Sequence, residues 1–180
     1  MLTIAKTETK HIGPLVRVEQ LTLTDDEGHT HQREVVRHPG AVLIVAPAPT
    51  DRDKLLFVRN FRVAVDEWML EFPAGKLEEG EQPINAAARE LAEETGYRPG
   101  AITPIGTFYT SPGFCDELMH VFAASDLTHV GQNLDHGEHL TVEIVSIADA
   151  RAMIADGRIT DGKTIAALWV WLMHTGRATP

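Results

Sequence analysis

The chain is organised around residues 75–97, GKLEEGEQPINAAARELAEETGY. Pro83 stands where a first-turn proline belongs, and Gly96 stands where helices commonly end. The stretch therefore predicts one helix over Pro83 to Thr95, preceded by a loop that begins at Gly75.

Three glutamates should share one side of this helix, because spacings of three and four residues bring side chains together. They are Glu90, Glu93 and Glu94. Clustered like charges repel, and a divalent cation would remove that repulsion; carboxylate oxygens suit Mg²⁺ or Mn²⁺. Acidic helix faces are more often simply solvated. Solvation alone, however, needs neither Arg89 beside the carboxylates nor Glu81 on the preceding loop, so the pattern favours a metal site.

The order of these residues resembles the Nudix box. That motif is a Gly, five residues, a Glu, seven residues, then Arg-Glu-apolar-any-Glu-Glu-any-Gly-apolar, and residues 75–97 match every defined position. Seven fixed residue types coincide by chance in fewer than about one in 10^8 windows, so the match is specific. The resemblance implies an α/β fold, an α/β/α sandwich with a mixed β-sheet, and metal-dependent hydrolysis of a nucleoside diphosphate linked to another group.

The resemblance also implies roles for individual residues. The expected ligands of Mg²⁺ (or Mn²⁺) are Glu90, Glu93, Glu94 and the carbonyl of Ala74. Arg89 and Glu81 would orient the site. A general base is expected on the loop before the last predicted strand, where Glu138 stands, with Glu93 and Glu143 as rival candidates.

Segments on either side of the box resemble one branch of the family, the ADP-ribose pyrophosphatases. They are residues 37–42 (RHPGAV), 58–62 (VRNFR) and 70–75 (LEFPAG), together with Pro112, which stands sixteen residues beyond Gly96. Arginine forks match phosphate oxygens, so Arg59 and Arg62 are candidates for the substrate diphosphate, although Arg59 could equally be a surface charge. The resemblance adds further candidate substrate residues: Glu71, Ser111, Pro112 and Gly113.

Composition limits the class of protein. The chain has 180 residues, 43% of them hydrophobic, with a formal net charge of −10. Such acidity argues against a nucleic-acid partner. The single cysteine, Cys115, excludes an internal disulfide and suits a reducing compartment. With no spanning or targeting segment in view, we expect a soluble cytoplasmic protein without a membrane partner.

The two ends of the chain predict accessory elements. Residues 1–38 read as an N-terminal β-hairpin extension, and residues 39–180 as the Nudix hydrolase domain. In this branch the extension often crosses to a second subunit, so a homodimer is expected. Two closing helices are predicted, residues 148–156 and a second one that opens at Asp161 and ends at Gly176. The second has Ile165, Leu168, Trp169 and Leu172 on its buried face.

The leading hypothesis is hydrolysis of ADP-ribose to AMP and ribose 5-phosphate. One alternative is the same chemistry on another nucleotide: GDP-mannose, diadenosine polyphosphate, NADH or an oxidised nucleotide. The other is a module that senses such nucleotides without cleaving them. A complete carboxylate set argues against a pure binder, because binding alone does not require several metal ligands.

Overall fold

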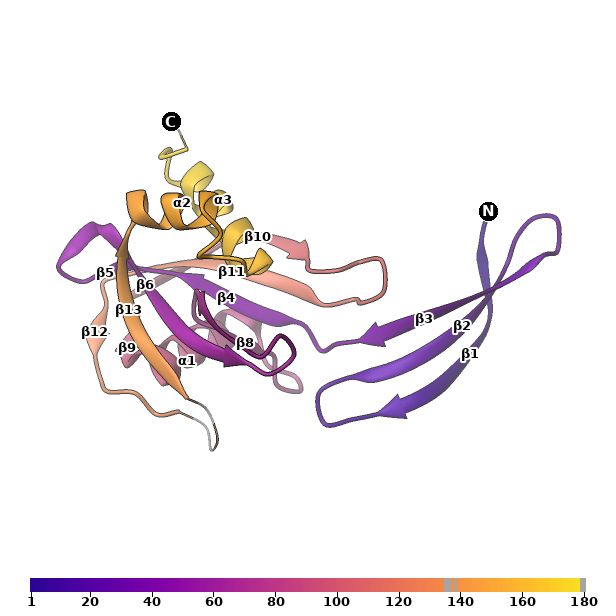
Figure 1. The fold of residues 1–180 in the computed structure, drawn as a ribbon. Coiled ribbons are helices and arrows are strands. Elements are labelled where there is room, and N and C mark those ends of the chain that lie inside the picture. Colours follow the sequence, from indigo (N-terminus) through magenta and orange to yellow (C-terminus); the bar gives the residue numbers. More distant parts are fainter. Residues whose placement is uncertain (135–136, 138, 179–180) are drawn as a thin grey trace. The chain divides into compact units, whose positions relative to one another are not determined.

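The computed structural model describes residues 1–134, 137 and 139–178 (Figure 1). The chain forms two compact units. One is Met1–Gly40 with Phe108–Met119, and the other is Ala41–Thr107 with the described chain from His120 onward. No helix within these residues is both long and apolar enough to cross a membrane.

The first unit is built on a three-stranded antiparallel sheet. Strands β2 (Arg17–Thr24) and β3 (Thr30–Arg37) form the expected hairpin, and β1 (Thr3–Ile12) pairs with the other edge of β2. The sequence analysis did not separate β1 from the hairpin, although Gly13-Pro14 is a turn signal at its end. Nearly every residue of β1 is exposed.

The second unit contains all three helices and the remaining strands, except that the end of β10 and the start of β11 belong to the first unit. Its strands are β4 (Ala41–Val45), β5 (Pro47–Ala48), β6 (Asp51–Arg62), β7 (Glu67–Glu71), β8 (Ala74–Lys76), β9 (Tyr97–Arg98), β10 (Ala101–Tyr109), β11 (Leu118–Ser125), β12 (Thr128–His129) and β13 (Leu140–Ser146). Their order is β10-β11-β4-β8 in one sheet and β13-β6-β5 in another, with β7 on β6. The helices are α1 (Pro83–Thr95), α2 (Ile147–Ala155) and α3 (Gly162–His174).

Strand β4 lies at the centre of the core. All five of its residues are buried, which is the pattern of a strand covered on both faces. Helix α1 lies on one side of the strands, and α2 and α3 lie on the other (Figure 1). The predicted α/β/α sandwich is confirmed.

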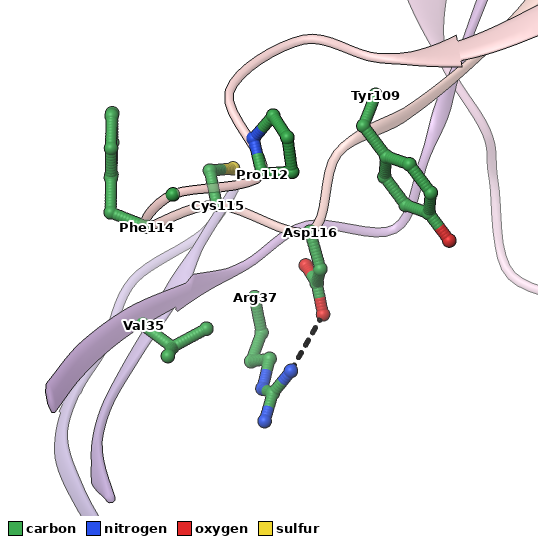
Figure 2. Close-up of a pocket in the computed structure, with 8 residues that line it drawn as sticks. Val35, Arg37, Tyr109, Pro112, Phe114, Cys115 and Asp116 are labelled. Carbon is green, nitrogen blue, oxygen red and sulfur yellow. Dashed lines mark hydrogen bonds and ion pairs between the residues drawn. The ribbon is translucent and has the colours of Figure 1, made fainter.

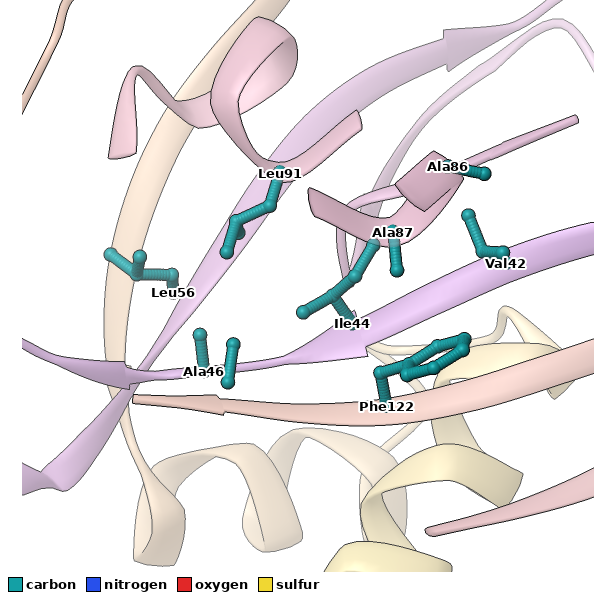
Figure 3. Close-up of a cluster of buried hydrophobic side chains, with 9 residues drawn as sticks. Val42, Ile44, Ala46, Leu56, Ala86, Ala87, Leu91 and Phe122 are labelled. Atoms are coloured by element: carbon teal, nitrogen blue, oxygen red, sulfur yellow. The ribbon is translucent and has the colours of Figure 1, made fainter. Parts of the chain in front are cut away.

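Helix α1 has the predicted bounds. Gln82 precedes Pro83 at its start, and Gly96 ends it with a φ of 75°, which is the left-handed conformation that glycine adopts readily. Figure 3 shows Ala86, Ala87 and Leu91 of α1 packed over the strands of the core. Two small alanines allow the helix close to the sheet, so the row of glutamates on α1 is set on a rigid base.

Helix α3 corrects one expectation. Its buried residues are Thr164, Ala167, Leu168, Trp171 and Leu172, which recur at three- and four-residue spacings. Trp169 is 58% exposed. At 100° per residue, position 169 falls away from that stripe.

Candidate active site

Strand β8 and helix α1 bring two of the three helix glutamates next to the expected carbonyl ligand. The backbone N–H of Ala74 donates to Oε2 of Glu94 at 3.0 Å, and Glu94 is only 5% exposed. A Cβ added at Gly75 would overlap the carboxylate of Glu90. Glycine at this position therefore allows Glu90 to lie directly against the β8 backbone.

Arg89 connects the helix glutamates to the preceding loop. Its Nε and Nη2 donate to the two oxygens of Glu81 at 3.0 and 2.9 Å. Its Nη1 donates to Glu90 at 2.8 Å and to Glu93 at 3.0 Å. These hydrogen bonds lower the pKa of Glu81 below its usual value, although burial acts in the opposite direction. The guanidinium thus holds three carboxylates of the box in one network.

The donor chemistry of this cluster fits a hard divalent cation. Carboxylate and carbonyl oxygens are the ligands that Mg²⁺ prefers, and Glu90 and Glu94 both lie against the residues of β8 that precede α1. Among residues 1–134, 137 and 139–178, no three His, Cys, Asp or Glu side chains are gathered as a preformed metal site. Glu90 and Glu93 are instead both bonded to Arg89.

Two of the candidate substrate residues bond to each other. Nε and Nη2 of Arg62 donate to the two oxygens of Glu71 at 2.7 and 2.5 Å. Lys163 adds a third bond, from Nζ to Oε2 of Glu71 at 2.6 Å. The side chain of Glu71 is 1% exposed, so its carboxylate binds other protein groups and is not accessible to solvent. The side chain of Arg62, by contrast, is 39% exposed. The sequence analysis did not identify Lys163.

Arg59, the other candidate for the diphosphate, pairs with a rival candidate for the base. Its Nε donates to Oε1 of Glu143 at 2.5 Å and its Nη2 to Oε2 at 3.2 Å. The two residues lie on the paired strands β6 and β13. Both oxygens of Glu143 thus accept hydrogen bonds from the Arg59 guanidinium.

The chain after α1 returns to cap that helix. Strand β12 pairs there with β9. Nε2 of Gln132 then donates to the carbonyl of Glu94 at 2.6 Å, and the N–H of Asn133 donates to the carbonyl of Glu93 at 3.0 Å. The principal candidate base, Glu138, lies outside the described residues.

The remaining candidates, Ser111, Pro112 and Gly113, belong to the first unit. The carbonyl of Ser111 accepts hydrogen bonds from the N–H groups of Phe114 and Cys115, so the chain turns at these residues. Beside this turn is a pocket of about 350 Å³ (Figure 2), lined by Val35, Arg37, Tyr109, Pro112, Gly113, Phe114, Cys115 and Asp116. In it, Nη1 of Arg37 donates to Asp116 at 3.0 Å.

Known proteins resemble this chain in sequence and in fold. A family model described as the NUDIX domain matches residues 36–168. The chain is 43% identical, over 78% of its length and 76% of the relative's, to an ADP-ribose pyrophosphatase of Bacillus subtilis (strain 168). It is 38% identical to a methanol dehydrogenase activator of Bacillus methanolicus, over 91% of this chain and 88% of that one. A crystal structure of an ADP compounds hydrolase superposes with a TM-score of 0.84 at 26% identity, covering 98% of this chain and 96% of the other.

Proposed function

The chain belongs to the NUDIX family, and from this premise we propose that it hydrolyses ADP-ribose to AMP and ribose 5-phosphate with the help of a divalent cation. The observation that carries the proposal is the contact of α1 with β8. There the Ala74 N–H bonds to Glu94, and Gly75 leaves space for Glu90. An acidic row fixed against a backbone segment is what a cation-dependent diphosphate site requires.

We assign the cation to Glu90, Glu93, Glu94 and the carbonyl of Ala74, with Mg²⁺ as the expected ion and Mn²⁺ as a substitute. Nudix hydrolases in general require such an ion; when bound, it neutralises charge on the diphosphate and acidifies water. Arg89 and Glu81 would keep the glutamates oriented while the substrate enters and leaves. Their support is the hydrogen-bond network that Arg89 already makes with Glu81, Glu90 and Glu93.

The substrate would be held by positive and backbone groups. Arg62, half-exposed and fixed by Glu71, would bind a phosphate oxygen, and Arg59 would be a second, weaker contact. We propose that Glu71 acts on the substrate through Arg62. Ser111, Pro112 and Gly113 stay candidates for substrate binding, on the resemblance to the ADP-ribose pyrophosphatases. Glu138 would accept the proton of the attacking water, with Glu93 as the alternative.

We further propose that the enzyme is a homodimer. The three-stranded sheet of the first unit has few buried residues, and β1 exposes Ile4 and Ile12. A second copy would cover such a surface without a new partner protein. The lone cysteine supports a cytoplasmic location, because a reducing compartment keeps it as a free thiol.

A product assay tests the substrate. The purified chain, with Mg²⁺, is offered ADP-ribose, GDP-mannose, a diadenosine polyphosphate, NADH and an oxidised nucleotide, and products are separated by chromatography. We expect ADP-ribose to give AMP and ribose 5-phosphate with the highest kcat/KM. A higher kcat/KM for a substrate without the second ribose would reject ADP-ribose. Calorimetric binding of ADP-ribose without turnover, with either Mg²⁺ or Mn²⁺, would favour a sensing module.

A further inference from the structure

The first turn of α3 contacts the segment that leads into β8. Nζ of Lys163 donates to Oε2 of Glu71 at 2.6 Å and to Oδ1 of Asp161 at 2.8 Å. Oγ1 of Thr164 accepts a hydrogen bond from the N–H of Phe72 at 3.1 Å. Asp161 also caps α3 by accepting from the N–H of Thr164 at 2.9 Å. The first turn of α3 thus forms hydrogen bonds with Glu71 and Phe72, which precede the proposed metal ligand Ala74 in the chain.

The following residues of that segment are held from other directions. The carbonyl of Pro73 accepts from the N–H of Ile44 at 2.9 Å, and the N–H of Ala74 donates to Glu94 at 3.0 Å. Each residue from Glu71 to Ala74 is therefore hydrogen-bonded to another element. Glu71 and Phe72 bond to α3, Pro73 bonds to β4, and Ala74 bonds to α1. Only Phe72 and Pro73 separate Glu71 from Ala74 along the chain.

Charge makes Lys163 important in this arrangement. Glu71 is 1% exposed, and a buried carboxylate needs cationic partners on the protein. Lys163 is itself largely covered, with 16% of its side chain exposed, whereas Arg62 keeps 39%. Without Lys163, the only cation bonded to Glu71 among the described residues would be Arg62, which is the more exposed of the two partners. The carboxylate would then lose its bond to α3.

We propose that Lys163 is a positioning residue of the metal site. By fixing Glu71 to α3, it holds the segment from Phe72 to Ala74 so that the Ala74 carbonyl and Glu94 face the same cation. The inference rests on the proposed function in one respect only, namely that Ala74 and Glu94 are ligands. Lys163 acts on the ligands through Glu71 and does not itself touch the substrate.

The test measures Mn²⁺ binding to the full chain by calorimetry, without substrate and well below the unfolding temperature. We expect Lys163→Met to weaken Mn²⁺ binding by roughly 10- to 100-fold, the range for residues that orient metal ligands. Lys163→Arg keeps the charge and should recover most of the affinity. Lys54→Met is the matched control, because Lys54 pairs with Asp51 on the surface with 49% of its side chain exposed, and it should bind Mn²⁺ like the wild type.

A second readout is the Mg²⁺ concentration for half-maximal hydrolysis, which should rise in Lys163→Met by a similar factor. A purely structural role would lower the unfolding temperature and leave Mn²⁺ affinity unchanged, and that result would overturn the proposal. If Lys163→Met does not fold, Lys163→Gln decides by the same criterion, since its amide still donates one hydrogen bond. If the wild type binds Mn²⁺ but cleaves no nucleotide, the proposed function fails. The Mn²⁺ affinities of the wild type and Lys163→Met would still test whether Lys163 positions the metal ligands.

Discussion

At the scale of single residues, Glu94 differs from its neighbours on α1. It is 5% exposed and accepts a hydrogen bond from the backbone of β8, whereas 31% of the Glu93 side chain is exposed and that side chain bonds to Arg89. A carboxylate held by backbone loses little freedom when it binds a cation. We therefore expect Glu94 to be the least replaceable ligand.

The first prediction concerns Glu94→Gln. The amide oxygen can still accept from the Ala74 N–H, so the fold should persist, but the negative charge is lost. We expect kcat for ADP-ribose to fall on the order of 10²-fold or more, as for the loss of a group that stabilises charge in the transition state. Glu79→Gln, on the exposed loop before α1, is the control and should retain full activity. Equal kcat values for the two variants would argue against a metal role for Glu94.

The second prediction concerns Gly75→Ala. The added Cβ would overlap the Glu90 carboxylate, so either that side chain or β8 must move. We expect a loss of about 1–3 kcal/mol in the free energy of unfolding, as for other overpacked sites, together with loss of hydrolysis. Chemical denaturation and the product assay measure the two effects. Gly162→Ala is the matched control, because an added Cβ there has no neighbour within 4 Å.

At the scale of elements, ion pairs connect β2, β3 and the turn after β10. Arg37 on β3 bonds to Glu19 on β2 and to Asp116. Hydrogen bonding from Arg37 lowers the pKa of Glu19. Burial alone would raise the pKa of Asp116, but bonds from the N–H of His38 and from Arg37 lower it. Folding of the first unit should therefore depend on pH.

The third prediction gives the sign of this dependence. Because both pKa values fall on folding, the stabilisation is fully present above the ordinary values of 4.5 and 3.8 and is lost as pH falls through the folded values. Hydrogen-exchange protection of β2 and β3 should decrease in that acid range. Arg37→Met should make this decrease smaller, whereas Arg33→Met, at an exposed position of β3, should leave it unchanged. An acid response of undiminished size in Arg37→Met would contradict the assignment.

The packing of α1 shows which features of an element can be read locally. Its bounds, Pro83 and Thr95, were predicted correctly because the start and end signals lie within the helix and its caps. The buried face of α3 was predicted less well. Trp169 was placed inside, but the side chains that meet the strands are those of Leu168, Trp171 and Leu172. Hydrophobicity alone did not distinguish neighbouring apolar positions.

At the scale of the whole molecule, the fourth prediction tests the dimer. Ile4 and Ile12 on β1 are 60% and 75% exposed, and a second copy would cover them. We expect the wild type to sediment as a dimer. The double variant Ile4→Glu and Ile12→Glu should sediment as a monomer with an unchanged far-ultraviolet circular dichroism spectrum. A wild type that remains monomeric across the concentrations used would reject the dimer.

The resemblance of residues 75–97 to the Nudix box implied the α/β/α class. The sequence by itself determined the helix from Pro83 to Thr95 and the acidic row with Arg89 and Glu81. These follow from residue spacing along one helix and its adjoining loop, where local geometry dictates which side chains meet. Only the tertiary structure decided that Gly75 makes room for Glu90, that Arg59 pairs with Glu143, and that Lys163 reaches Glu71 across 92 positions of sequence. Contacts of that kind depend on how sheets and helices pack, because residues distant in the chain become neighbours only when the core closes around them.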